Sequence, residues 1–178
     1  VETVLVSEQT DPAWVELVPG TPARLPDGRV LTTLDEDDTR RLAVDGKSVS
    51  PPGLQVRAIL DVETSGAALV SASIEQTEVH VFRITPDGAT TMVSSGPGVH
   101  GARSAAGTTV LTSRSLSHHG ARTTVSGPDG AEVAIESRAL RPPFLPAVRL
   151  AEAGERHIPY AVLLPRDHVP GSRPLPVV

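Results

Sequence analysis

Short runs of apolar residues alternate with turn-forming residues along most of this 178-residue chain. Asp-Gly pairs begin at Asp45, Asp87 and Asp129, each between two such runs, and they are 42 residues apart (87 − 45 and 129 − 87). An Asp-Gly pair in this setting is typical of a tight β-hairpin, because the turn needs positive φ and both residues tolerate it. The pattern predicts a hairpin recurring about every 40 residues, which is the period of a four-stranded propeller blade.

The apolar runs predict three consecutive β-units, over residues 21–52, 53–96 and 97–137. Before residue 140 no stretch places apolar residues at helical spacing over a useful length, so almost no helix is expected there. The expected strands are residues 30–34, 39–44, 56–62, 67–73, 79–84, 89–93, 108–113, 122–125 and 133–135. The predicted fold class is therefore all-β, with about three four-stranded antiparallel blades of a β-propeller.

Both ends of the chain depart from this period. Residues 1–6 are predicted to be a strand that completes a preceding unit, and with no initial methionine the chain is expected to be a piece of a longer protein. Residues 141–146 contain three prolines, which remove backbone donors, so they are interpreted as a linker. Residues 156–164 and 175–178 are expected to be strands outside the repeat, in a second domain beginning near Leu150.

The predicted domain organisation has three parts. Residues 1–140 form the propeller fragment, residues 141–150 form the linker, and residues 151–178 form the opening strands of the second domain.

Composition narrows the possible partners. The net charge is −5 and there is no basic run, which argues against nucleic acid. The longest apolar runs are far shorter than a membrane span, and the first residues lack the features of a signal peptide, so a cytoplasmic protein without membrane contact is expected. The absence of cysteine excludes disulfides and thiolate metal sites.

Residues 96–101, Gly-Pro-Gly-Val-His-Gly, match the letters of the dinucleotide fingerprint G-x-G-x-x-G. That fingerprint needs a helix opening on its last glycine, so that the helix N-terminus meets the pyrophosphate. A Thr/Val strand pattern follows here instead. The stretch is interpreted as a turn between blades, and no cofactor is expected.

The acidic stretch at residues 35–38 resembles a calcium loop only in its charge. An EF-hand would need glycine at its sixth position and glutamate at its twelfth, where this chain has Arg40 and Gly46. A solvated hairpin turn is the preferred interpretation. The four like charges also discourage edge pairing with other chains.

The histidines give no metal-binding pattern. Adjacent histidines on a strand point to opposite faces, so His118 and His119, near Ser113 and Ser115, are interpreted as exposed loop residues. Four further histidines are isolated in the sequence: His80, His100, His157 and His168. We therefore expect no metal ligand, and since no G-x-S-x-G motif occurs, no catalytic residue either.

Residues 73–84 resemble a blade of the dipeptidyl-peptidase IV-like serine peptidases, within the prolyl oligopeptidase family. That family's blade reads small-Ser-x-Glu-Pro-x-Glu-x-His-Leu-Tyr, and here Gln76 replaces the proline and Phe82 the tyrosine. Residues 95–100 resemble the start of the family's next blade, Thr-x-Gly-x-Gly-x-His. Residues 158–165 and 174–178 are similar to the segment that opens its catalytic domain.

The resemblance implies the last three blades of an eight-bladed propeller, followed by the first strands of a truncated α/β-hydrolase domain. The catalytic serine, aspartate and histidine would lie downstream, and the paired glutamates that hold the substrate's amino group would lie upstream. Glu75 and Glu78 differ from that pair in spacing and are interpreted as solvent-facing loop charges. The parent would be a serine peptidase, whereas this chain alone would be inactive.

Two functional hypotheses follow. In the first, the chain is a non-catalytic propeller fragment of a serine exopeptidase that cleaves short, proline-containing peptides, and the propeller gates and positions these substrates. In the second, it is a free-standing propeller module for protein interaction. The hydrolase-like tail favours the first. Open blade faces and free terminal strands also predict a homo-oligomer.

Overall fold

The computed structural model of the chain describes residues 2–5, 7–145, 147–165, 168–169 and 171. These residues form strands, turns and irregular backbone but no helix, so none that could span a membrane is found among them. The strands are β1 (Ala23–Arg24), β2 (Val30–Glu36), β3 (Thr39–Val44), β4 (Lys47–Ser48), β5 (Gln55–Val62), β6 (Ala68–Ser73), β7 (His80–Ile84), β8 (Thr90–Met92), β9 (Val99–Ala105), β10 (Thr108–Arg114), β11 (Ala121–Ser126), β12 (Glu132–Ile135), β13 (Ala147–Ala153) and β14 (Ile158–Leu164).

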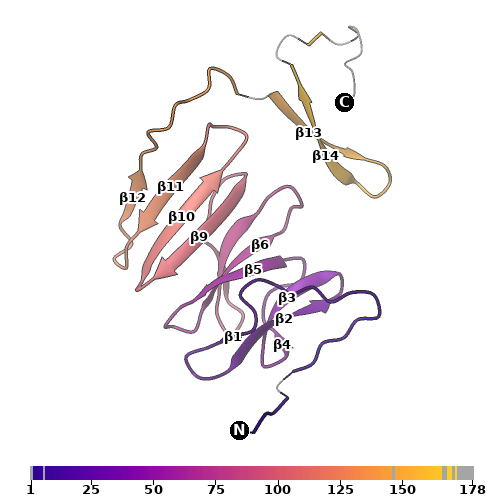
Figure 1. Cartoon of the computed structure of the whole chain (residues 1–178), viewed down its shortest axis with the longest axis vertical. Helices are drawn as coiled ribbons and strands as arrows, with labels where there is room; N and C mark the ends of the chain where they lie inside the picture. Colours follow the sequence, from indigo (N-terminus) through magenta and orange to yellow (C-terminus); the bar gives the residue numbers. More distant parts are fainter. Residues whose placement is uncertain (1, 6, 146, 166–167, 170, 172–178) are drawn as a thin grey trace.

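Twelve of these strands form three four-stranded antiparallel sheets, each a meander in which consecutive strands pair (Figure 1). Blade 1 contains β1 to β4, blade 2 contains β5 to β8, and blade 3 contains β9 to β12. The blades follow one another in space, with β3 against β5 and β7 against β9. The predicted all-β class with three four-stranded blades is confirmed.

Each of the three predicted Asp-Gly turns joins the third strand of a blade to its fourth. Gly46, Gly88 and Gly130 have φ of 75°, 94° and 79°, as these turns require. The first is a two-residue turn in which Asp45 also has positive φ, 47°. The other two turns are longer loops that contain the sequence Pro-Asp-Gly, and the N–H of the glycine donates to the carbonyl three residues before it. The repeat in the sequence therefore covers two turn types.

A further Pro-Asp-Gly turn, ending at Gly28, joins β1 to β2 and was not predicted. The N–H of Gly28 donates to the carbonyl of Leu25, and the N–H of Leu25 donates to the carbonyl of Arg29. This turn lies outside the 42-residue interval, since it connects the first and second strands of its blade.

Blade 2 is packed on both faces. Val70, Phe82 and Ile84 point toward blade 1 and belong to a buried cluster with Leu31 and Leu42. Their neighbours along the strands point toward blade 3, where Leu69, Val81 and Ala102 form a second cluster. Because successive residues of a strand face opposite sides, packing on both faces explains why nearly every residue of β6 is buried.

The innermost strand of blade 1 is much shorter than its counterparts in the other blades. β1 pairs only with Val30 and Leu31, whereas β5 and β9 pair along the whole of β6 and β10. The chain before β1 turns away from β2, because Thr21 donates its N–H to the carbonyl of Val18 and Pro19 accepts the N–H of Ile59. Within the described part of the chain, no strand therefore pairs with residues 32–36 of β2 on that side.

Two expectations about the blade strands need correction. Residues 2–5 are not in a strand, although residues 1–6 were predicted to be one; Val1 and Val6 lie outside the described residues. β9 was not predicted, and it begins within the stretch interpreted as a turn. Its sequence has few β-branched residues, and it forms a strand because it pairs with β10 and buries His100 and Ala102 against blade 2.

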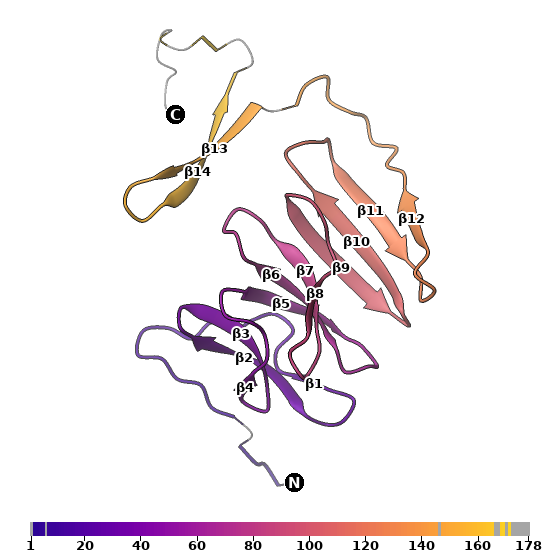
Figure 2. The same ribbon diagram turned by 180° about the vertical axis from the view of Figure 1, so that it is seen from behind.

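The C-terminal strands form a separate hairpin. β13 and β14 pair from Ala153 and Ile158 back to Ala147 and Leu164, and they lie away from the three blades in both views (Figure 2). The strand predicted at residues 156–164 is confirmed as β14, whereas β13 begins inside the stretch interpreted as a linker. Residues 175–178 lie outside the described part of the chain, and the domain division remains a prediction.

Candidate functional site

A buried polar cluster joins blades 2 and 3, centred on two histidines. His80 in β7 and His100 in β9 are stacked, with ring centroids 4.9 Å apart and an angle of 21° between the rings. Both are buried. The two histidines are isolated in the sequence, and the packing of adjacent blades brings them together.

His80 links a carboxylate to a hydroxyl. Its Nε2 lies 2.9 Å from Glu78 Oε2, and its Nδ1 lies 2.9 Å from Ser94 Oγ. Because the carboxylate can only accept, Nε2 carries a proton, and in the neutral imidazole Ser94 then donates to Nδ1. Ser94 Oγ also accepts the N–H of Val81 at 3.0 Å. Glu78 is thus engaged with the cluster, which corrects its interpretation as a solvent-facing charge.

His100 has the same arrangement. Its Nε2 lies 3.0 Å from the carbonyl of Gly96, and its Nδ1 lies 2.8 Å from Ser113 Oγ. Since a carbonyl only accepts, the proton is again on Nε2 and the serine donates to Nδ1. Ser113 therefore belongs to the polar cluster that forms the joint between blades 2 and 3.

Ser94, His80 and Glu78 have the composition of a nucleophilic relay, in which a histidine lies between a hydroxyl and a carboxylate. A nucleophile must also reach its substrate. Ser94 is only 3% exposed, and its oxygen is occupied by the Val81 N–H and the imidazole. The geometry therefore supports a structural role, in which the cluster satisfies polar groups at the joint between blades.

The glycine-rich stretch at residues 96–98 is part of this joint, as the predicted inter-blade connection. The N–H of Val79 donates to the carbonyl of Gly98, and the N–H of His100 donates to the carbonyl of Val79. A Cβ on Gly98 would lie 2.2 Å from the carbonyl oxygen of Arg114, so only glycine fits there. The strand β9 follows where a dinucleotide site would need a helix.

His118 and His119 lie in the connection from β10 to β11, as predicted, but they are half-buried rather than exposed. The ring of His118 lies 3.4 Å from the carbonyl of its neighbour. Ser113 pairs with His100, and Ser115 Oγ lies 3.0 Å from Ser117 Oγ. The described contacts therefore do not combine these residues into a hydrolytic site.

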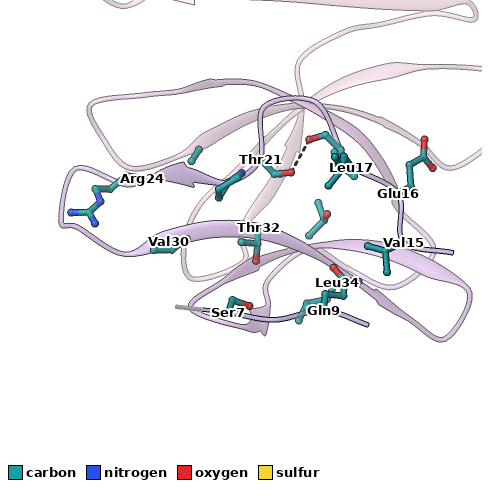
Figure 3. A pocket seen from close by; sticks show the side chains of 14 residues that line it. Ser7, Gln9, Val15, Glu16, Leu17, Thr21, Arg24, Val30, Thr32 and Leu34 are labelled. Atoms are coloured by element: carbon teal, nitrogen blue, oxygen red, sulfur yellow. Dashed lines mark hydrogen bonds between the residues drawn. The ribbon is translucent and has the colours of Figure 1, made fainter. Parts of the chain in front are cut away.

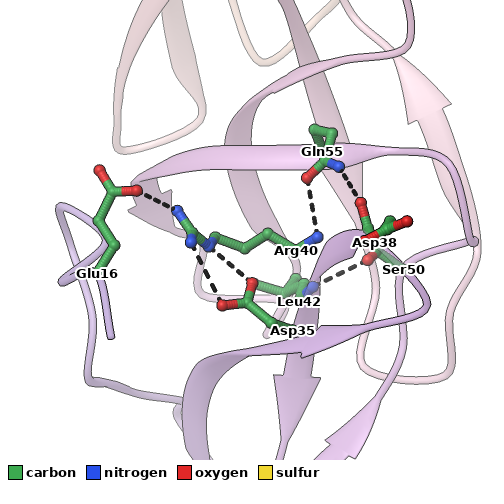
Figure 4. A network of polar contacts seen from close by, with 7 residues as sticks. All are labelled: Glu16, Asp35, Asp38, Arg40, Leu42, Ser50 and Gln55. Carbon is green, nitrogen blue, oxygen red and sulfur yellow. Dashed lines mark hydrogen bonds and ion pairs between the residues drawn. The ribbon is translucent and has the colours of Figure 1, made fainter. Parts of the chain in front are cut away.

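The acidic stretch forms a hairpin turn between β2 and β3, as predicted, with positive φ at Asp37 and Asp38. The side chain of Arg40 lies between two carboxylates, 2.9 Å from Asp35 and 2.7 Å from Glu16 (Figure 4). The hydrogen bonds that the guanidinium of Arg40 donates to Asp35 and Glu16 raise the pKa of Arg40. The N–H of Arg40 also donates to Gln55 Oε1 at 2.9 Å, which ties blade 1 to blade 2.

A cavity of about 610 Å³ lies between β2 and the segment that precedes β1 (Figure 3). One wall consists of Val30, Thr32, Thr33 and Leu34, and the opposite wall includes residues 15–18. The cavity has the size of a small-molecule or peptide pocket, and much of its lining is apolar. No motif in the sequence predicts this cavity, because its two walls come from separate segments of the chain.

Comparison with known proteins gives a likeness of fold. No family model matches the chain, and no curated protein matches it in sequence. The structure is similar to the crystal structure of Porphyromonas gingivalis dipeptidyl peptidase 4, with a TM-score of 0.62 and 12% sequence identity. The match covers 80% of this chain and 22% of that protein, so the chain spans less than a quarter of that protein's length. At this identity the likeness shows a shared fold.

Proposed function

We propose that this chain is a non-catalytic part of the propeller of a serine exopeptidase related to dipeptidyl peptidase IV. The observation that carries the proposal is the three-blade arc, whose fold matches a dipeptidyl peptidase 4 over 80% of the chain. The resemblance of residues 73–84 and 95–100 to that family's blades supports it independently. In this role the blades gate and position short peptides that reach an active site formed elsewhere.

The exposed apolar side chains of the hairpin β13–β14 are an argument for a further domain that covers them. Directly opposite residues of an antiparallel pair share a face, so Leu150 and Leu163 lie on one side and Tyr160 and Ile158 on the other. All four are exposed. An isolated two-stranded hairpin is marginally stable in water, and apolar side chains on both faces favour burial between further layers. We assign the hairpin to the opening of the peptidase's catalytic domain.

The gene decides between this proposal and a free-standing interaction module. A reading frame that continues past Val178 into a G-x-S-x-G motif is expected, whereas a stop codon directly after Val178 would contradict the proposal. The longer product should release the chromophore from proline-directed dipeptide substrates. The 178-residue chain should show no turnover above background, and turnover that titrates with a serine-directed phosphonate would refute its non-catalytic assignment.

We also propose that the isolated chain self-associates through its open blade faces. On the outer face of blade 3, Val110, Val125 and Val133 lie side by side across three strands. Val133 is 64% exposed, and exposed apolar patches tend to find partners. Sedimentation over a wide concentration range should show a dimer or larger species, and Val133→Lys should shift it toward the monomer. A monomer at all concentrations would contradict this proposal.

A further inference from the structure

The free edge of β2 carries backbone groups that point away from β3. The carbonyl of Val30 accepts the N–H of Asp45 at 2.9 Å, so Val30 faces the side of β3. Hydrogen-bonding direction alternates along an antiparallel strand, and every second residue after Val30 therefore also faces β3. Thr33 and Asp35 face the opposite side.

No described backbone group pairs with Thr33 or Asp35 on that side. β1 ends its pairing at Leu31, and the preceding segment bonds to itself and to β5. Thr33 is only 9% exposed. Backbone polar groups in such a place are normally paired, because leaving them unsatisfied costs free energy. The edge is therefore prepared to accept another strand.

The cavity opens on this edge. Thr32, Thr33 and Leu34 all line it, although their side chains alternate between the two faces of the sheet. Three consecutive residues can line one cavity when it meets the edge of the strand. Across the cavity, Val15, Leu17 and Val18 supply an apolar wall for the side chains of an added strand.

The charges around the cavity differ between its two ends. Near the end of β2, carboxylates outnumber guanidinium groups by five to two. Arg40 pairs with Glu16 and Asp35, Arg41 pairs with Glu36, and Asp37 and Asp38 add two carboxylates in the adjoining turn. At the start of β2, Arg24 lies opposite Val30, and the described residues give it no ion pair. A strand added antiparallel to β2 would have its N-terminal end at the acidic end of the cavity.

We propose that this edge is a binding site for an extended peptide that adds antiparallel to β2. The peptide backbone pairs with Thr33 and Asp35, its side chains enter the cavity, and a basic residue near its N-terminus meets the carboxylates. Addition of a strand to an exposed sheet edge is a common mode of peptide recognition, with affinity supplied by main-chain hydrogen bonds. The site is independent of the function proposed above.

The probe is an acetylated, amidated and fluorescently labelled pentapeptide, Lys-Val-Thr-Val-Thr, titrated into the full chain by anisotropy. Two analogues carry N-methyl groups, each on one set of alternate amides, so that only one analogue blocks the amides that face β2. That analogue should bind at least about tenfold more weakly and the other like the parent. The reversed sequence, with lysine at the C-terminus, should bind about threefold more weakly in low salt.

Amide NMR locates the binding. The largest shifts on binding should fall on Thr33 and Asp35, and in the free protein the Thr33 amide should exchange quickly with solvent. Thr33→Pro removes the free N–H without removing a bond to β3 and should abolish binding. The charge variant Asp37→Asn/Asp38→Asn should weaken binding about threefold in low salt.

Three results would overturn the proposal. They are equal binding of the two N-methylated analogues, shifts confined to other strands, and a Thr33 amide that is already protected in the free protein. If Thr33→Pro does not fold, the pair of N-methylated peptides still decides the question, because it uses the unchanged protein.

Discussion

Blades 2 and 3 have the same strand order and nearly the same third turn, yet they differ sharply in burial. Residues of β6 and β7 are almost all buried, whereas most residues of the corresponding strands β10 and β11 are only half-buried. Among the described residues, blade 2 packs against a blade on each face, whereas blade 3 packs against blade 2 on one face. The difference shows that the burial of a blade depends on the blades beside it more than on its own meander.

The sequences of the two blades reflect this difference. β6, Ala-Leu-Val-Ser-Ala-Ser, has small and apolar residues on both faces, as a strand packed between two layers requires. β12, Glu-Val-Ala-Ile, alternates, and its two large apolar residues lie on one face. Each of the first three experiments below compares a position in blade 2 with one in blade 3, and the fourth concerns the third turn of blade 2.

The largest effect is expected in the core between blades 1 and 2. Phe82→Ala should lower the free energy of unfolding by about 3–5 kcal/mol, because it leaves a cavity at a buried site. Ile135→Ala in blade 3 removes an exposed side chain and should cost about 0.5 kcal/mol or less. Urea unfolding followed by circular dichroism measures both. Equal losses would mean that blade 3 is packed in solution as blade 2 is.

The next effect tests the histidine joint. Ser94→Ala should destabilise the fold by about 2–4 kcal/mol, since it leaves the buried Val81 N–H and the Nδ1 of His80 without their partner. Ser117→Ala, in an exposed loop of blade 3, is the control and should change stability by about 0.5 kcal/mol or less. A loss as small as the control's would show that water replaces the hydroxyl and that the joint is open.

The third experiment compares two Pro-Asp-Gly turns. Gly88→Val and Gly130→Val both place a β-branched residue at positive φ, which should cost about 1–2 kcal/mol. A Cβ on Gly88 would also lie 3.0 Å from the carbonyl oxygen of Val49, whereas Gly130 has open space. Gly88→Val should therefore be the more destabilising change in the same urea assay. The reverse order would mean that Val49 moves aside at little cost.

The smallest effect concerns acid. The hydroxyl of Thr85 donates to Asp87 and holds the pKa of this carboxyl below the ordinary value of 3.8. A lowered pKa in the folded state contributes stability above 3.8 that is lost as the pH falls through the folded value. Thr85→Val should raise the pKa of Asp87 toward 3.8 in an NMR titration. An unchanged pKa would assign the shift to the turn backbone instead.

Much of blade 2 could be predicted from the sequence, because its strands carry strong local signals. Residues 79–84 have β-branched and aromatic side chains and end at a Pro-Asp-Gly turn, and the structure places β7 there. β9 and β13 gave weaker signals, since glycine, arginine and alanine take up much of their length. Their strand conformation depends on pairing with β10 and β14, and pairing partners are not visible in a local window.

The sequence by itself determined the period of the fold. Asp-Gly pairs at a fixed interval set the hairpins, because few other residues adopt positive φ in a tight turn. The tertiary structure alone decided which polar groups meet. It stacks His80 on His100, and it places His80 between Ser94 and Glu78, with a hydrogen bond to each. It also decided where β2 is left without a neighbour. The physical reason is that a turn depends on the torsion angles of a few adjacent residues, whereas a joint or a free edge depends on how whole blades come together.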